Sequence, residues 1–105
     1  MTRPTFSDGP AVPLMLEGLI DQPALARLFA DLHSAATVLG VREKGGAGRY
    51  AGGDELSPGV ALERLTAGTA RAVQVRYRYD GHEWTDTVLA TAAGYRIVRC
   101  RHDPG

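Results

Sequence analysis

Three side chains near the carboxyl-terminal end have the types that nucleophilic catalysis uses: Asp86, Cys100 and His102. A thiol becomes a strong nucleophile when an imidazole takes its proton and a carboxylate orients that imidazole. Two residues apart on a strand, however, Cys100 and His102 are separated by about 7 Å along one face, so a direct hydrogen bond needs favourable rotamers. We therefore favour a structural interpretation without a catalytic residue. Asp86 is then a buried hydrogen-bond acceptor beside a small buried cysteine.

These residues belong to a stretch that is predicted to form three antiparallel strands, at about 70–79, 82–91 and 95–102. Asp80 and Gly81 suit a two-residue type I′ turn between the first two strands. The resulting register separates an apolar face from a polar one, which a slip of one residue would mix. The apolar face carries Val73, Val75, Tyr77, Tyr79, Trp84 and Val88. The polar face carries Gln74, Arg76, Arg78, Glu83, Thr85 and Thr87.

The second turn, within "TAAGY", is compatible with more than one loop length. We expect a three-residue loop, Ala92-Ala93-Gly94, with the glycine in the left-handed region. This loop pairs Asp86 with Cys100 and adds Arg99 and Arg101 to the polar face. A loop one residue shorter or longer inverts the third strand, and Asp86 then meets Arg99 or Arg101 instead.

Two candidate binding surfaces follow from this register. The first is a partner-binding face that carries four arginines: Arg76, Arg78, Arg99 and Arg101. The second is a ligand pocket between helix and sheet near Tyr77 and Trp84. Because both aromatic residues face away from the arginines, they cannot serve as stacking platforms for bases beside them, and nucleic-acid binding is not expected.

The remaining segments predict a strand within 12–20, a helix over 22–34 and a second strand over 36–44. Asp21 is the expected N-cap of that helix, and apolar residues recur on one of its faces. A second helix is expected to begin at Ser57-Pro58, to bury Leu62 and Leu65, and to end at Gly68. The fold class is therefore α+β: a single small domain, 12–105, whose antiparallel β-meander and one or two amino-terminal strands are covered on one face by two helices. Residues 1–11 are expected to form a flexible arm.

A glycine-rich loop at 45–56 lies between a predicted strand and a predicted helix, as phosphate-binding loops do. It lacks the G-K-[ST] pattern, and Ala51 breaks the G-x-G-x-x-G spacing, so a flexible connector is expected. The three histidines lie on separate elements without a close pair. We therefore expect neither a cofactor nor a metal site.

The composition argues against nucleic-acid binding, disulfide formation and membrane association. The 105 residues include 12 basic and 12 acidic side chains, and this balance argues against strong non-specific binding to nucleic acid. Cys100 is the only cysteine, which excludes an intramolecular disulfide and favours a reducing, cytoplasmic setting. No apolar run approaches the ~20 residues that span a bilayer, so membrane association is not expected.

These features favour a small cytoplasmic accessory or protein-interaction domain without catalytic activity. It would present the arginine-bearing sheet face or an edge strand to a protein partner. The apolar stretch "VPLMLEGLI", which contains Met15, adds the prospect of a homodimer through a sheet edge. Two alternatives remain: a small enzyme or ligand-binding domain with a pocket near Asp86 and Cys100, and a weak nucleic-acid-binding domain.

Overall fold

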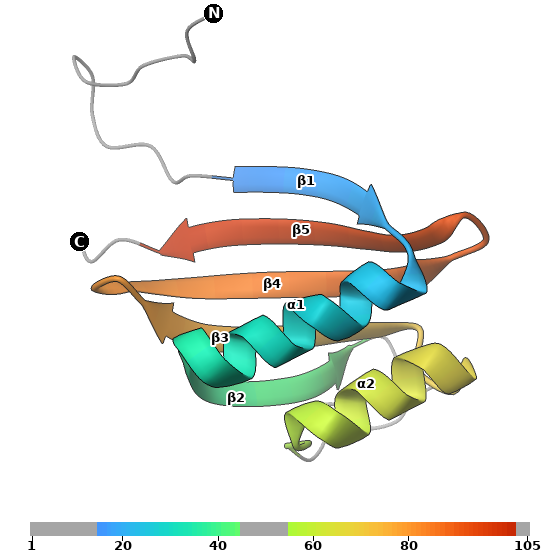
Figure 1. Cartoon of the computed structure of the whole chain (residues 1–105), viewed down its shortest axis with the longest axis horizontal. Helices are drawn as coiled ribbons and strands as arrows, with labels where there is room; N and C mark the ends of the chain where they lie inside the picture. The colour runs from blue at the N-terminus through green and yellow to red at the C-terminus, as the bar shows by residue number, and fades with distance from the viewer. Residues whose placement is uncertain (1–14, 45–54, 103–105) are drawn as a thin grey trace, which may run out of the picture.

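The computed structural model, which describes residues 15–44 and 55–102, consists of a five-stranded sheet and two helices (Figure 1). All strand pairs are antiparallel, and the strand order is β1-β5-β4-β3-β2. Both helices pack on the same face of the sheet, which confirms the predicted α+β class. The elements are β1 (Met15–Ile20), α1 (Gln22–Ala35), β2 (Thr37–Lys44), α2 (Pro58–Ala67), β3 (Ala72–Tyr79), β4 (His82–Thr91) and β5 (Gly94–His102).

Helix α1 begins where the sequence predicts it. The Asp21 carboxylate accepts a hydrogen bond from the backbone N–H of Ala24 at 3.0 Å, which satisfies one of the free donors of the first turn. The apolar stripe is directed at the sheet, and Leu25, Phe29 and Leu32 are buried. The helix crosses the sheet diagonally from the end of β1 toward β2 (Figure 1).

Helix α2 has the predicted signals at both ends. Ser57 Oγ accepts a hydrogen bond from the Val60 N–H at 3.2 Å, and Gly68 ends the helix in the left-handed region with a φ of 82°. Leu65 is buried as predicted, whereas Leu62 is only half-buried because Ala61 takes the most enclosed position on this face.

The first hairpin confirms the predicted register. Asp80 and Gly81 have φ values of 55° and 79°, the two positive angles that a type I′ turn needs. Val75 therefore lies opposite Asp86, and Tyr77 lies opposite Trp84.

The second hairpin corrects the predicted register. Its loop has two residues, Ala92 and Ala93, because Thr91 pairs directly with Gly94. The Thr91 hydroxyl holds this tight turn: it accepts a hydrogen bond from the Ala93 N–H at 3.1 Å and donates one to the Gly94 carbonyl at 2.9 Å. The third strand is consequently inverted relative to our expectation, and Asp86 lies opposite Arg99 rather than Cys100.

The two faces of the sheet differ in character. The helix-covered face, whose buried residues pack against α1 and α2, forms the core. The open face has no helix over it among the described residues, and it displays mostly polar side chains. The sheet residues of the core are Val41, Val73, Val75, Tyr77, Val88 and Ile97.

Strand β1 reaches its place at the sheet edge because of a glycine in β5. Gly94 has a φ of 142°, and a Cβ atom at this position would lie 2.7 Å from the Ile20 carbonyl oxygen. Only glycine therefore allows the end of β1 to approach β5 so closely.

Within residues 15–44 and 55–102 no helix is long and apolar enough to cross a bilayer. The predicted arm at 1–11 and most of the predicted glycine-rich loop, residues 45–54, lie outside the described residues.

Candidate functional site

A charged residue lies in the middle of the core. Asp86 is 0% exposed, and the side chains around it on β4 and β3 are largely apolar. An isolated carboxylate in such surroundings costs several kcal/mol, so it requires a cation and further hydrogen-bond donors. The inverted third strand supplies the cation, since it places Arg99 directly opposite Asp86.

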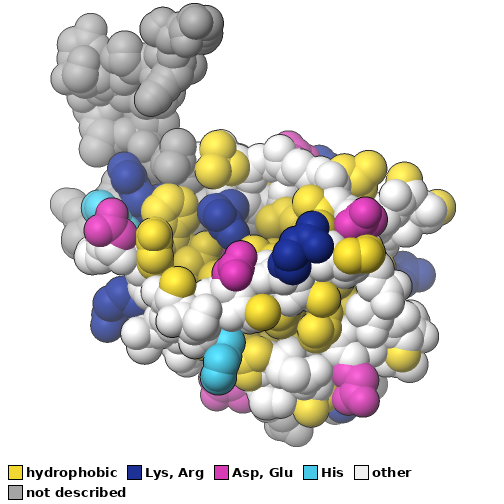
Figure 2. All heavy atoms as spheres, in the orientation of Figure 1, with side chains coloured by type: hydrophobic (Ala, Val, Ile, Leu, Met, Phe, Trp, Pro, Cys, Tyr) yellow, Lys and Arg dark blue, Asp and Glu magenta, His cyan; other side chains and the backbone are white. Residues whose placement is uncertain are grey.

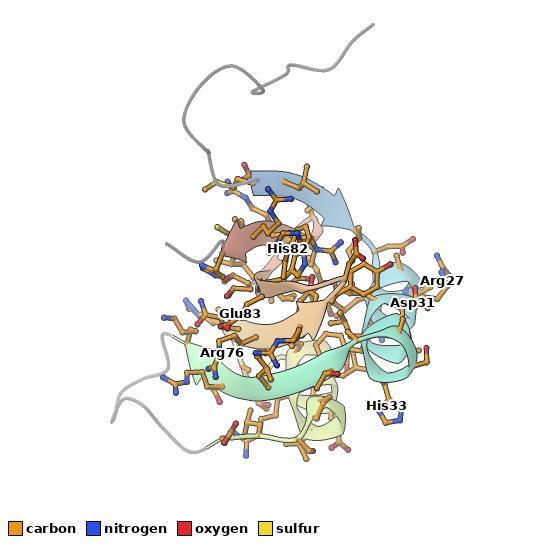
Figure 3. The ribbon with its side chains drawn as sticks, turned by 90° about the vertical axis from the view of Figure 1, so that its left-hand side faces the viewer. Arg27, Asp31, His33, Arg76, His82 and Glu83 are labelled. Atoms are coloured by element: carbon orange, nitrogen blue, oxygen red, sulfur yellow. The ribbon has the colours of Figure 1, made fainter. Side chains whose placement is uncertain are left out.

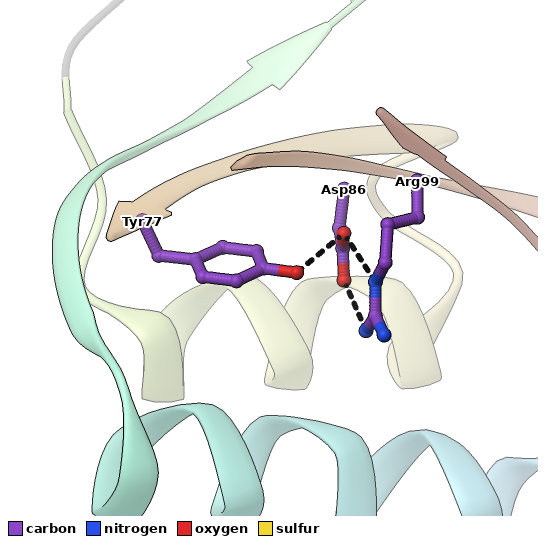
Figure 4. A network of polar contacts seen from close by, with 3 residues as sticks. All are labelled: Tyr77, Asp86 and Arg99. Carbon is purple, nitrogen blue, oxygen red and sulfur yellow. Dashed lines mark hydrogen bonds and ion pairs between the residues drawn. The ribbon is translucent and has the colours of Figure 1, made fainter. Parts of the chain in front are cut away.

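Arg99 and Tyr77 engage both oxygens of the Asp86 carboxylate (Figure 4). Arg99 donates from Nε to Oδ1 at 2.9 Å and from Nη2 to Oδ2 at 2.8 Å, which is the bidentate geometry that guanidinium groups favour. The Tyr77 hydroxyl donates to Oδ1 at 2.9 Å. Three strands, β3, β4 and β5, are therefore tied together below α1.

This network shifts the proton affinities of both donors. Burial, followed by the negative charge of Asp86 and the hydrogen bond to it, raises the pKa of the Tyr77 phenol well above its ordinary value of 10.0. The hydrogen bond to Asp86 raises the pKa of the Arg99 guanidinium. Both donors thus stay protonated across the physiological range, and the network acts as a fixed structural support rather than a proton carrier.

The residues considered for nucleophilic catalysis are not brought together. Cys100 pairs with Thr85 on the open face, whereas Asp86 points into the core from the opposite face. His102 lies on the open face too, and its Nε2 is 2.6 Å from the Thr85 hydroxyl oxygen. The carboxylate is therefore separated from the thiol and the imidazole by the sheet itself. The shorter second turn causes this separation, because it turns each residue of β5 to the face opposite to the predicted one.

The four arginines predicted to share one surface are divided between the two faces. Arg76 and Arg78 lie on the open face, where Arg76 pairs with Glu83 at 3.1 Å (Figure 3). Arg99 and Arg101 lie opposite Asp86 and Trp84, on the helix-covered face. This arrangement contradicts the predicted four-arginine face.

The aromatic pair is confirmed on the helix-covered face. Tyr77 is buried, and its ring stacks on that of Trp84 with 6.5 Å between the centroids and 6° between the planes. Trp84 is half-buried and donates from Nε1 to the Tyr79 carbonyl at 3.2 Å. Tyr79 itself is 49% exposed, because it lies at the hairpin end beyond the helices. The pair belongs to the core and does not line either of the grooves described below.

A groove of about 400 Å³ lies between α1 and the strands β1 and β5. It exists because the diagonal course of α1 leaves part of the helix-covered face uncovered beside β1, where apolar side chains show at the surface (Figure 2). Its lining is mostly apolar, although Arg99 of β5 also contributes to it, and Arg27 and Asp31 of α1 line its helix side. The residues that the sheet contributes to the groove include Leu16, Gly18, Ile20 and Ile97. A second groove, of about 360 Å³, lies between the end of α1 and β2.

Strand β1 is the most exposed apolar element of the described chain. Met15 is 63% exposed, Leu16 is 50% exposed and Leu19 is 57% exposed. Leu16 lies on the helix-covered face, opposite Arg99, whereas Met15 and Leu19 lie on the open face. The sequence marks this stretch as apolar but does not show that Leu16 and Leu19 are exposed. The available signal was the absence of alternation in "MLEGLI", which has apolar residues on both faces.

The backbone N–H and C=O groups of β1 point away from the sheet at alternate residues. Tyr79 and His82 close a two-residue hairpin and so exchange both backbone hydrogen bonds. In antiparallel strands, hydrogen-bonded pairs alternate with pairs that are not hydrogen-bonded. When this alternation is followed from β3 through β4 and β5, the N–H and C=O groups of Leu16, Gly18 and Ile20 point at β5. The corresponding groups of Met15, Glu17 and Leu19 therefore point away from the sheet.

The two edges of the sheet differ in how they are covered. At β2, the Leu56 N–H donates to the Val41 carbonyl at 2.8 Å, and Arg42 forms a bridge with Glu55. A bulge between Val38 and Gly40 further distorts that edge. At β1, the residues that the structure describes provide no neighbour beyond the strand. An apolar, unblocked edge is a template for pairing with another chain.

The described residues contain no group of three or more His, Cys, Asp or Glu side chains placed to hold a metal ion. The fold and the edge together define this part of the chain as a two-layer α+β domain with an exposed apolar edge strand. Comparison with protein-family models, curated protein sequences and solved structures finds no match to the chain.

Proposed function

We propose that this chain is a small cytoplasmic protein-interaction domain that recognises its partner through the outer edge of β1. The observation that carries the proposal is the difference between the two sheet edges. Residues 55 and 56 pair with β2 at Val41 and Arg42, whereas β1 offers outward backbone groups flanked by exposed apolar side chains. An added strand would gain main-chain hydrogen bonds and would remove apolar surface from water on both faces.

The core supports this function by fixing β1 in place. Leu16 lies opposite Arg99, and Arg99 is in turn held by the buried carboxylate of Asp86. On the open face, Glu17 forms an ion pair with Arg96 of β5. The edge is thus presented by a rigid sheet, which lowers the entropy lost when a partner strand is ordered against it.

The alternatives gain no support from the arrangement of residues. A pocket that combines Asp86 with Cys100 requires both on one face, and the four arginines would have to share a surface for the nucleic-acid alternative. We therefore keep the edge strand, and not the arginine-bearing face, as the interaction element.

The proposal is tested by blocking one outward donor of β1. Leu19→Pro removes an outward N–H and leaves the inward hydrogen bonds of Leu16, Gly18 and Ile20 in place, a substitution that edge strands tolerate. Leu19→Ala is the matched control, because it removes the same side chain but keeps the N–H. In capture experiments from the source cell, we expect Leu19→Pro to lose the bound protein that wild type and Leu19→Ala retain. Equal capture by all three proteins would refute the proposal, provided that slow exchange of the inward amides shows an intact β1.

A further inference from the structure

Strand β1 can pair with a second copy of itself in an antiparallel register that places its exposed apolar residues opposite small or apolar ones. In a symmetric pair of strands each residue must lie opposite one of the same sheet face, so the twofold axis passes through a residue and not between two residues. When the axis passes through Glu17, Met15 lies opposite Leu19 of the second copy, and Leu16 lies opposite Gly18. The outward backbone groups of Met15, Glu17 and Leu19 are then matched with the same groups of the other chain.

The space above Gly18 also favours the register centred on Glu17. The glycine has no positive φ, and a Cβ atom built on it would meet nothing within 4 Å. It therefore leaves an open place in the floor of the groove beside α1, although glycine weakens a strand. In contrast, a Cβ at Gly94 would meet a backbone oxygen at 2.7 Å. In the proposed register, the Leu16 side chain of the second copy covers the open place above Gly18 and contacts apolar groove residues.

The register with the twofold axis at Gly18 is less favourable, because nothing fills the space above the glycine. With the axis at Gly18, two glycines lie opposite each other, and the space above both stays empty. In its favour, it places Leu16 opposite Ile20 and separates the two Glu17 carboxylates, which the register centred on Glu17 places opposite each other. That repulsion is reduced because each Glu17 is already paired with Arg96 of its own chain. A formal net charge of zero adds no long-range repulsion between copies.

We propose that the occupant of the β1 edge is a second copy of this chain, paired antiparallel about Glu17 to give a continuous ten-stranded sheet. This inference rests on the proposed interaction role of β1 and names its partner. An interface of five residues per strand is at the small end of protein interfaces, so the dimer should form and dissociate with concentration.

The first test measures the native mass by sedimentation over a concentration series. We expect wild type to pass from one to two chains, and Leu19→Pro to stay monomeric. Leu16→Ala should weaken dimerisation about tenfold, because it empties the place above Gly18. Val60→Ala, which truncates a 37% exposed apolar residue of α2, is the matched control and should leave dimerisation unchanged. Glu17→Gln should strengthen it about two- to fivefold by removing the like-charge pair.

The second test reads the register by disulfide formation in a Cys100→Ser background. Glu17→Cys places two thiols opposite each other with Cα atoms about 5.5 Å apart, within the range for a disulfide. Leu19→Cys is the control on the same face, since its two copies would be about 13 Å apart along the strands. We expect covalent dimers from Glu17→Cys only. Equal rates for both variants, or a wild type that is monomeric throughout, would overturn the inference.

The outcomes separate this inference from the proposed function. A monomeric wild type that still captures another protein, with capture lost in Leu19→Pro, overturns the homodimer and leaves the interaction role of β1 intact. If Leu19→Pro alters neither self-association nor capture, both proposals fail. A dimer that Glu17→Cys traps and Leu19→Pro abolishes supports both.

Discussion

Arg99 lies directly opposite Asp86 on the neighbouring strand and holds its carboxylate with two hydrogen bonds of 2.9 and 2.8 Å. The carboxylate is fully buried, whereas the Arg99 side chain is 32% exposed and connects the network to the groove beside α1. A single polar contact in the core thus also fixes the strand that holds β1 at the edge of the sheet.

Removal of Arg99 should be far more costly than removal of the whole network. Arg99→Met leaves the Asp86 carboxylate buried without its cation, and we expect a loss of about 3–5 kcal/mol in the free energy of unfolding. Tyr77→Phe, Asp86→Leu and Arg99→Met combined remove every charge and the hydroxyl while approximately keeping volume. This triple variant should be within about 2 kcal/mol of wild type or above it. Urea denaturation measures both values, and a triple variant less stable than Arg99→Met would contradict this account.

The Tyr77 phenol should make the fold sensitive to alkaline pH. Its pKa is raised in the folded state, so the native protein holds this proton more tightly than the unfolded chain does. The resulting stabilisation is complete below pH 10 and is lost as the pH rises toward the raised pKa. The free energy of unfolding should therefore fall by up to about 1.4 kcal/mol per pH unit above pH 10. Stability measurements over this range provide the test.

Tyr77→Phe is the control for that titration. It should cost about 1.5–3 kcal/mol at neutral pH, since the hydrogen bond to a charged acceptor is lost. Above pH 10 its stability should decline less steeply than that of wild type. Phenolate absorbance provides a second measurement, because the Tyr77 phenol should ionise only well above pH 10 while the protein is folded. Parallel pH profiles for the two proteins would rule out this role for the phenol.

The structure shows which parts of the fold the sequence could predict. Helix caps at Asp21 and Ser57 and the type I′ turn at Asp80-Gly81 depend on neighbouring residues only, and all three were found correctly. The second hairpin depended instead on the competition between two loop lengths. Local turn preference favoured three residues, but the Thr91 hydroxyl stabilises the shorter turn.

The charge of Asp86 distinguishes between the two possible lengths of the second turn. The longer loop placed Asp86, in an otherwise apolar row, opposite an uncharged cysteine. Burial of a carboxylate without a cation costs more free energy than the difference between two turn types. The register that places Arg99 opposite Asp86 is therefore the more stable one. Because the turn sets the face of every residue of β5, the predicted arginine face and the predicted site at Cys100 both depend on its length. The apolar stretch of β1 is visible in the sequence, but its place at the sheet margin is not, because that place depends on the order of all five strands.

Gly94 should be as important for the interaction edge as any side chain of β1. Alanine at this position meets both a φ of 142°, which is strained for a residue with a Cβ, and a contact of 2.7 Å with the Ile20 carbonyl. We expect Gly94→Ala to cost about 1–3 kcal/mol or more and to loosen the end of β1. Gly59→Ala is the matched control: nothing lies within 4 Å of its added methyl group, and in α2 it should stabilise the fold by up to about 1 kcal/mol. Denaturation gives the two free energies, and amide exchange at Leu16, Gly18 and Ile20 reports whether β1 separates from β5 before the rest of the sheet unfolds. If those amides stayed as protected in Gly94→Ala as in wild type, the close approach of Ile20 to Gly94 would not be what holds the edge strand in place.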